Sequence, residues 1–186
     1  QNNSEHSNPA PSQRLWSLGR GGVREASEVR AQARRDGLTF HFSRICELCH
    51  AKGSELADGD PEKKMKGRAV LLGGNVKNED FNWVELCELG SGPPSMEAAK
   101  ALDAMGSLPV YVVKTGDARG AYNQSLLKGV ETWVTLPDNR WPKPWRKKFR
   151  KPVVRFVLAF YGHADAGGFW EEHCEETNSR QLGTAG

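Results

Sequence analysis

The sequence lacks any long hydrophobic run. No apolar stretch approaches the ~18 residues that a membrane-spanning helix needs, and no signal-peptide pattern opens the chain. We therefore expect an intracellular protein with no membrane partner. The chain begins with Gln1 instead of Met, which indicates a piece of a longer reading frame.

The chain also has little excess of charge of either sign. Its 26 Lys and Arg residues only slightly outnumber its 23 Asp and Glu residues, and the formal net charge is +3. An excess this small does not by itself predict a nucleic-acid partner. Such a partner has to be inferred from where the charges lie along the chain.

Cysteine is scarce as well. Four cysteines in 186 residues are too few for a disulfide scaffold, so we expect reduced thiols. Residues 46–50 read C-E-L-C-H, the spacing of c-type haem attachment. A haem would need an axial ligand opposite His50, and a zinc ion would need a second ligand pair, and neither is visible. Cys46 and Cys49 are interpreted as small apolar side chains, with a zinc or haem module as the alternative.

Aliphatic residues are thinly spread, above all at the start of the chain. Residues 1–37 are rich in Ser, Asn, Gln, Pro and Gly, and they contain Arg but no Lys. The stretch Arg24–Arg35 could form a helix, but its apolar residues are too weak to bury much surface. We expect a disordered or weakly helical leader over 1–37, followed by a domain over 38–186.

The domain is predicted to open with a β-hairpin. Two extended segments, Thr39–Cys49 and Lys63–Leu72, flank a turn-rich stretch at Gly53–Pro61. Three lysines and an arginine give the second strand a positive charge.

The strongest helix signal follows two prolines. Ser95 is a suitable N-cap, Glu97 lies in the first turn where the helix dipole favours an anion, and Gly106 is a suitable C-cap. Apolar residues recur between them at helical spacing, which predicts a face packed into the core. These residues are Met96, Ala99, Leu102 and Met105.

Three further strands and a second helix complete the pattern. The β-branched run Leu108–Asp117 predicts a central strand covered on both faces. Shorter strands are predicted over Thr132–Leu136 and Pro152–Phe160, and a helix over Ala164–Thr177. The order of these elements predicts an α+β fold.

Asp117 is the first candidate for chemistry. A carboxylate that ends a buried strand and precedes a turn of small residues can hold a metal ion, and the open backbone N–H groups of the turn can approach a phosphate. The alternative is an ordinary turn or helix cap. Arg68 in the basic strand could hold a phosphate, or it could be a surface arginine whose stem covers apolar neighbours.

The densest cluster of charge spans Arg140–Lys151. Seven cations and three aromatic residues lie within twelve residues without an acid, so phosphate neutralisation and base stacking are both available. The alternative is a solvated loop whose prolines prevent regular structure. The candidate nucleic-acid-binding residues are Arg140, Lys143, Arg146, Lys147, Lys148, Arg150 and Lys151.

Four segments of the chain form a recognisable series. They are Lys66–Val70 (KGRAV), Asp117–Tyr122 (DARGAY), Thr132–Pro137 (TWVTLP), and Leu158–Gly162 (LAFYG) with Trp170 eight residues further on. The series resembles the reverse transcriptase of copia-type LTR retrotransposons, in which K-A-R-L-V, D-V-K-T-A-F and L-Y-G-L-K-Q-A-P-R-A-W segments occur in this order at similar separations. The resemblance covers roughly residues 42–174. It implies a partial right-hand polymerase, with a fingers hairpin and an incomplete palm sheet.

The resemblance implies roles for the second segment. Asp117 is similar to the first catalytic, metal-binding aspartate of the palm, with the Ala118 carbonyl as a second ligand. Gly120 and Ala121 would offer backbone N–H groups to the triphosphate. Tyr122 would lie under the sugar and exclude a 2′-hydroxyl.

The resemblance also implies roles for the outer segments. Lys66 and Arg68 would close on the triphosphate, and Tyr161 and Gly162 would hold the template base and the incoming nucleotide. The parent enzyme would use two Mg²⁺ ions while a primer 3′-hydroxyl attacks the α-phosphate. Its partners would be an RNA or DNA template–primer, a dNTP and the remainder of the Pol polyprotein. The resemblance also implies a place in a cytoplasmic particle or the nucleus.

The chain departs from the family in three places. The second aspartate pair, in a Y-V-D-D hairpin, does not occur in the sequence. Residues 165–168 read D-A-G-G where the family has a Pro-Arg pair, and Asn123–Gln124 stand where it is apolar. One aspartate cannot hold two Mg²⁺ ions, so we expect neither polymerase activity nor tightly bound Mg²⁺ from this chain alone. A non-catalytic nucleic-acid-binding relic of such an element is the first alternative, and the module at residues 46–50 is the second.

Overall fold

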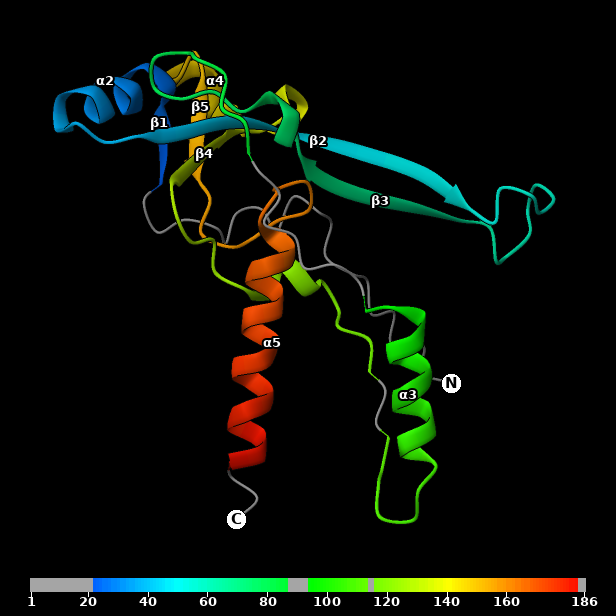
Figure 1. Ribbon diagram of the computed structural model, residues 1–186. Coiled ribbons are helices and arrows are strands. Elements are labelled where there is room, and N and C mark those ends of the chain that lie inside the picture. The colour runs from blue at the N-terminus through cyan, green and yellow to red at the C-terminus, as the bar shows by residue number, and fades with distance from the viewer. Residues whose placement is uncertain (1–21, 87–93, 114–115, 184–186) are drawn as a thin grey trace.

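The computed structural model describes residues 22–86, 94–113 and 116–183 of the chain. A five-stranded mixed sheet forms its centre (Figure 1). In spatial order the strands are β1 (Val23–Glu25), β5 (Pro152–Arg155), β4 (Glu131–Thr135), β2 (Phe40–Lys52) and β3 (Lys64–Leu71). Strands β2 and β4 pair in parallel, and the other neighbours are antiparallel. With four α-helices in the described residues, this confirms the α+β class.

Helix α2 (Ala26–Asp36) covers one face of the sheet. Its Val29 and Ala33 are 0% exposed. Together with Ala26 they pack against side chains of three strands: Phe40, Phe42, Trp133 and Val153. The prediction that this stretch buries little surface is wrong, because small Ala and Val side chains let the helix lie close against large aromatic ones. The rest of the expected leader, residues 1–21, lies outside the described residues.

The opposite face of the sheet carries a second core cluster. Successive residues of a strand point to opposite faces, so β2 sends Phe42 toward α2 and Ile45 into this cluster. The buried members are Ile45, Leu71, Val134, Leu136, Phe156 and Phe160. Strand β5 ends at Arg155, earlier than predicted, and Phe156 and Phe160 pack here instead. The prediction of a strand near Thr132–Leu136 is confirmed by β4.

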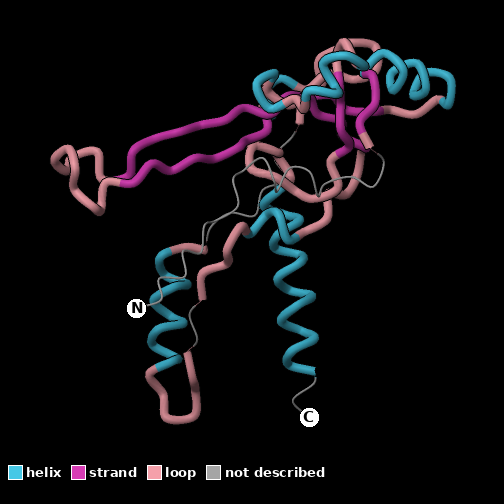
Figure 2. Tube along the Cα trace, turned by 180° about the vertical axis from the view of Figure 1, so that it is seen from behind, coloured by secondary structure: helices cyan, strands magenta, loops and turns pink. Residues whose placement is uncertain are grey.

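Strands β2 and β3 form the predicted hairpin, which projects from the body of the sheet (Figures 1 and 2). Ile45 pairs with Leu71 at its base, and Lys52 pairs with Lys64 near its tip. Both residues at the base are buried, whereas both lysines at the tip are exposed. The hairpin is therefore anchored at one end only.

Helix α3 (Met96–Gly106) forms as predicted but does not enter the core. The hydroxyl of Ser95 caps it by accepting a hydrogen bond from the Ala98 N–H at 3.2 Å. No residue of α3 is buried, so the prediction of a core-facing stripe is wrong. Both tube and ribbon views place α3 away from the sheet (Figure 2).

The segment after α3 is an exposed loop instead of a central strand. Val110 is 85% exposed and Val112 is 82% exposed. A β-branched run becomes a strand only when a neighbour pairs with it, and no strand in the described part of the chain does so. Residues 114–115 of the expected strand lie outside the described residues. The prediction for Leu108–Asp117 is therefore wrong over its described part.

Helix α5 (Ala166–Gly183) confirms the helix predicted over Ala164–Thr177 and extends beyond it. It leaves the body of the molecule roughly parallel to α3 in Figures 1 and 2. None of the described helices combines the length and the apolar character needed to cross a membrane.

Candidate nucleic-acid interface

The hairpin is anchored where β3 ends. The backbone N–H of Leu71 donates to the carbonyl of Tyr161 at 2.7 Å. Gly162 has a φ of +88°, and a Cβ placed on it would lie 2.1 Å from the Leu71 carbonyl oxygen. Only glycine fits this position without a backbone shift. The basic strand and the segment around Tyr161, which are distant in sequence, therefore meet at this point.

A cleft of about 800 Å³ opens beside the anchor. Small residues contribute much of its lining, and Glu85 also lines it. The small lining residues are Gly73, Gly74, Gly162 and Ala164. A lining of this kind lets a ligand come close to the backbone.

Two tyrosines from separate segments meet near the same anchor. The ring centroids of Tyr122 and Tyr161 lie 4.7 Å apart, with an interplanar angle of 59°. The buried Ser125 holds the two segments together, because its hydroxyl donates to the Tyr122 carbonyl and its own carbonyl accepts from the Ala159 N–H, both at 2.9 Å. The structure thus brings together the second and fourth segments of the resemblance.

The turn that precedes Tyr122 has an open backbone. Gly120 has a φ of +63° and starts a 3₁₀ turn over Ala121–Gln124. The side-chain oxygen of Asn123 in this turn is buried and has no hydrogen-bond partner within the described residues. An unpaired buried oxygen costs free energy, and a ligand that donates a hydrogen bond would satisfy it.

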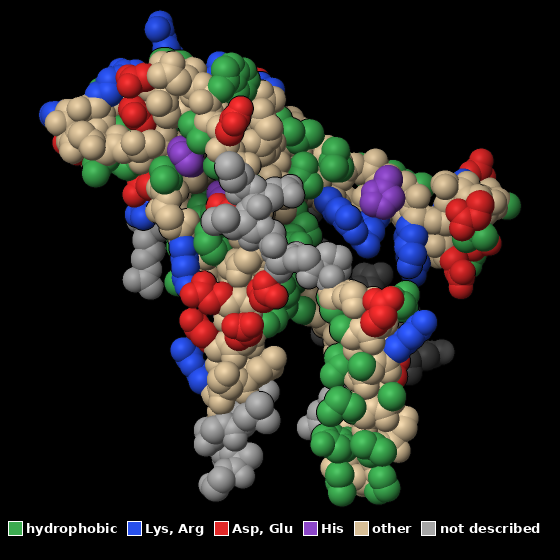
Figure 3. Space-filling model, viewed as in Figure 1, with side chains coloured by type: hydrophobic (Ala, Val, Ile, Leu, Met, Phe, Trp, Pro, Cys, Tyr) green, Lys and Arg blue, Asp and Glu red, His purple; other side chains and the backbone are tan. Residues whose placement is uncertain are grey.

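The hairpin carries three exposed cations on one face. Lys64, Lys66 and Arg68 occupy alternate positions of β3, so their side chains share a side of the strand. None of them forms an ion pair within the described part of the chain. Figure 3 shows Lys and Arg side chains along the hairpin. Their charges are available to an anionic ligand.

Asp117 does not end a strand. It lies with Ala118 in an exposed irregular segment. The described residues contain no group of three or more His, Cys, Asp or Glu that could hold a metal ion. Because two-metal catalysis needs several carboxylates around the ions, the residues present do not fit a two-magnesium centre.

The basic block is partly ordered and partly built into the core. Helix α4 (Lys143–Lys148) forms in spite of Pro144, because a proline in the first turn removes no intrahelical hydrogen bond. The alternative interpretation, a solvated loop whose prolines prevent regular structure, is therefore wrong for this part of the block. Trp141 and Trp145 pack against the core cluster, and the Trp141 indole N–H donates to the Leu136 carbonyl at 2.9 Å. These two rings are engaged in packing, so the expected stacking of bases on them is not supported.

The cations of the block differ in their surroundings. Arg140 forms an ion pair with Glu47 of β2 at 2.8 Å. Arg146 donates to the Asp138 carbonyl at 2.7 Å, and the Glu25 carboxylate accepts from the backbone N–H groups of Arg150 and Lys151. The remaining candidates, Lys143, Lys147 and Lys148, are exposed.

The residues of the C-E-L-C-H run do not converge. All of them lie on β2, where alternate residues point to opposite faces, so Cys46 and Cys49 face apart. Cys46, Cys49 and Cys174 are free thiols. Cys87, the other cysteine of the chain, lies outside the described residues. A zinc or haem site at residues 46–50 gains no support from this arrangement.

The sequence did not predict one pair of buried histidines. His41 of β2 and His163 line a cavity of about 450 Å³ on the sheet face opposite α2, beside an ion pair between Lys128 and Glu172. Burial lowers the pKa of both imidazoles, and the charge of His163 lowers that of His41 further. The only sequence signal is the position of His41 between two phenylalanines of a predicted strand.

Comparison of the chain with protein-family models, with curated proteins and with solved structures gave no match. Its function is therefore inferred from the residues and their geometry.

Proposed function

We propose that this chain is the fingers and first part of the palm of a copia-type reverse transcriptase, and that it binds template–primer and dNTP. One observation carries the proposal. Three segments of the sequence resemblance, separated by tens of residues, converge. At the end of β3 the Leu71 N–H donates to the Tyr161 carbonyl, and the Tyr161 ring contacts the Tyr122 ring. Convergence of this kind is expected if the segments share one ligand.

We call the place where the end of β3, Tyr122 and Tyr161 meet the tyrosine junction. Each part of the tyrosine junction and of the adjoining hairpin suits a different part of that ligand. Lys66 and Arg68 are exposed and could neutralise a triphosphate. The open turn at Gly120 offers backbone N–H groups, and the Tyr122 ring offers a flat surface for a sugar. The glycine-lined cleft beside Tyr161 and Gly162 leaves room for a nucleotide.

A non-catalytic nucleic-acid-binding relic is the second candidate. The observation that favours it is the exposed position of Asp117, together with the lack of any metal-binding group of three or more His, Cys, Asp or Glu residues in the described part of the chain. The two candidates differ in the ligand they require. Both bind template–primer, but only the polymerase proposal requires a dNTP site that prefers deoxyribose.

The test is an anisotropy titration of the 186-residue chain with a labelled template–primer over a range of salt. The double variant Lys66→Gln/Arg68→Gln removes two hairpin cations, so the slope of log affinity against log salt should fall by about 2. The matched control, Arg35→Gln/Lys100→Gln, removes two exposed cations elsewhere and should leave the slope close to that of the parent. If hairpin and control variants behave alike, the proposed interface is wrong.

A competition experiment separates the two candidates. Unlabelled dNTP and rNTP are titrated against a fluorescent dNTP bound to the chain. The polymerase proposal predicts a preference for dNTP that is lost in Tyr122→Ala. Equal competition by both nucleotides in the parent chain would favour the relic.

A further inference from the structure

A second cleft, of about 260 Å³, lies on the sheet face that α2 covers. It is lined by residues of α2, β2, the loop 75–83, the end of β4 and the start of β5. The residues that matter below are Arg30, Arg44, Lys77, Phe81, Trp83 and Lys151. The face is opposite that of the histidine cavity, because Arg44 and His41 lie at odd spacing on the same strand.

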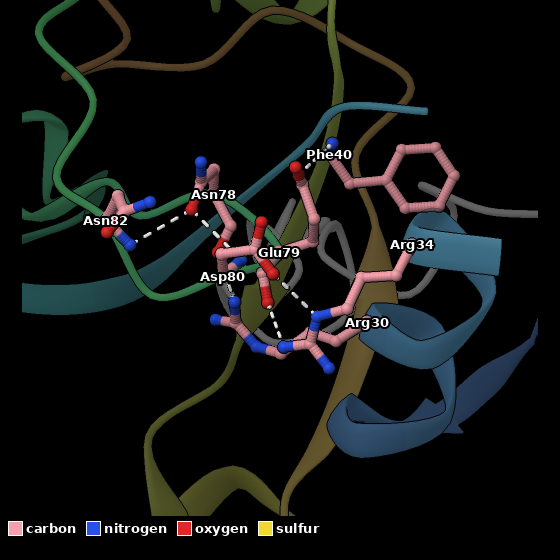
Figure 4. Close-up of polar contacts among 7 residues, drawn as sticks. All are labelled: Arg30, Arg34, Phe40, Asn78, Glu79, Asp80 and Asn82. Carbon is pink, nitrogen blue, oxygen red and sulfur yellow. Dashed lines mark hydrogen bonds and ion pairs between the residues drawn. The ribbon is translucent and has the colours of Figure 1, made fainter. Parts of the chain in front are cut away.

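The loop that forms the outer wall of the cleft is tightly braced (Figure 4). The side-chain oxygen of Asn78 accepts from the N–H groups of Asp80 and Asn82, both at 3.0 Å. At the tip, Phe81 has a φ of +66°, a left-handed conformation that bulky residues rarely adopt. Strained residues of this kind persist where the surrounding structure fixes them, and they concentrate at binding sites.

Arg30 of α2 holds the strained ring in place. Its guanidinium lies between the rings of Phe42 and Phe81, 3.8 and 4.0 Å from their centroids. It also donates to the Asn78 carbonyl (Figure 4). Arg30 is therefore a positioning residue that presents Phe81 at the rim of the cleft.

The acids of the loop are turned away from the cleft. Asp80 forms an ion pair with Arg34 at 2.7 Å, and the Glu79 carboxylate accepts from the Phe40 N–H at 3.0 Å. No Asp or Glu occurs among the described residues that line the cleft. The lining is consequently basic and aromatic.

The remaining cations and aromatic rings of the cleft are accessible. Phe81 is 55% exposed and Trp83 is 63% exposed. The ammonium of Lys77 lies 4.3 Å from the centre of the Trp83 ring. Arg44 and Lys151 are exposed, and neither forms an ion pair within the described residues.

We propose that this cleft binds single-stranded nucleic acid. One base stacks on Trp83 beside Phe81, and the phosphates on either side of it are neutralised by Arg44, Lys77 and Lys151. The cleft is smaller than the ~300–1,000 Å³ of a site that encloses a drug-sized ligand. It therefore suits one nucleotide of a nucleic-acid strand that continues over the protein surface. The inference does not depend on the polymerase proposal, since it uses none of the hairpin or tyrosine-junction residues.

The test measures anisotropy of a labelled twelve-nucleotide oligothymidylate with the full 186-residue chain. Loss of the stacking surface in Trp83→Ala should weaken binding by about 5- to 150-fold, the range observed for one stacked base. Trp83→Phe keeps a ring and should lose less. Arg44→Gln/Lys151→Gln should lower the salt slope by about 1.4, because each single-strand phosphate contact contributes about 0.7.

The matched control is Arg35→Gln/Lys100→Gln, which removes two exposed cations outside both proposed sites and should bind the oligonucleotide like the parent. Thermal unfolding checks that each variant is folded. If Trp83→Ala is not folded, Arg44→Gln/Lys151→Gln, which changes two exposed side chains, provides the test. The proposal is overturned if the parent does not bind the oligonucleotide or if the cleft variants bind as tightly as the parent. It is also overturned if a phosphopeptide or inorganic phosphate competes as well as the strand does.

The two proposals fail separately. Loss of template–primer binding in the hairpin variant alone would support only the tyrosine junction. Loss of oligonucleotide binding in the cleft variants alone would support only this second site.

Discussion

Helices α2 and α3 have the same length and opposite environments. Each spans 11 residues, and α3 is the more apolar of the two. Four residues of α2 are buried, including the charged Arg30, whereas no residue of α3 is. Burial is therefore set by what a helix meets in the fold, and the composition of the helix alone does not determine it.

The difference lies in the partners. The stripe of α2 meets large aromatic side chains of the sheet, and its polar edge is clamped by the loop 75–83 through the Arg34–Asp80 ion pair. A cation held between two rings combines the dispersion energy of packing with attraction to the ring faces. Its neighbours in the fold thus make a weakly apolar helix part of the core.

Among the described residues, helix α3 lies against the loop that follows it and is not part of either core cluster. A Cβ placed on Gly106 would lie 1.9 Å from a side-chain methyl of Val113, so the loop returns close against the end of the helix. The apolar side chains of this unit are largely exposed: Met96, Leu102, Met105, Leu108, Val110, Tyr111, Val112 and Val113. The stripe of α3 is therefore an exposed surface in the described structure.

The most severe test of this contrast places a carboxylate on each helix. Val29→Asp puts an unpaired charge into the core beneath α2, and it should lower the free energy of unfolding by about 3–5 kcal/mol. Leu102→Asp, on the exposed stripe of α3, should change it by about 0.5 kcal/mol or less. Urea unfolding followed by circular dichroism measures both. Equal losses in the two variants would show that α3 is packed in solution.

Lowering the pH should also affect the sheet around His41 and His163 differently from α3. Burial lowers the folded-state pKa of His41 and His163 below the ordinary 6.5, so the unfolded chain binds more protons. The stability due to their neutral forms is complete above pH 6.5 and is lost as the pH falls toward the lower folded values. In α3, hydrogen bonds from its own backbone N–H and from Ser95 lower the pKa of Glu97 below 4.5. That first turn should keep its capping interactions until the pH falls below 4.5.

Urea midpoints between pH 8 and pH 5, compared with amide exchange in α3, measure this separation. His41→Gln/His163→Gln should flatten the pH dependence between pH 6.5 and pH 5. His50→Gln, at an exposed position of β2, is the control and should keep it. A parent chain whose midpoint does not fall below pH 6.5 would contradict the burial of the two imidazoles.

Local signals predicted some of the elements correctly. The turn chemistry around Asp58–Pro61 and the flanking extended runs correctly gave the β2–β3 hairpin, and Ser95 correctly marked the start of α3. Both signals act between residues that are close in sequence. They need no knowledge of the tertiary fold.

Predictions that required a distant partner fared worse. The burial of α2 depends on Phe40, Phe42 and Trp133, and the β-branched run at 108–113 required a neighbouring strand that the fold does not provide. The resemblance gave Tyr122 and Tyr161 roles around one nucleotide, but the contact between their rings was not predicted. The basic cleft at Trp83 was not anticipated, because its walls come from five separate parts of the chain.

The mildest test concerns the cap of α3. Ser95→Ala removes the hydroxyl that accepts from the Ala98 N–H, which should destabilise the helix by about 1 kcal/mol. Because α3 is not part of the core, this loss should appear as about fivefold faster amide exchange within α3 while the urea midpoint of the whole chain stays constant. Ser27→Ala, in the first turn of α2 and outside any cap, should leave exchange in α3 unchanged. A shift of the global midpoint in Ser95→Ala would mean that α3 unfolds together with the sheet. The two helices would then differ in their exposure but not in their coupling to the unfolding of the sheet.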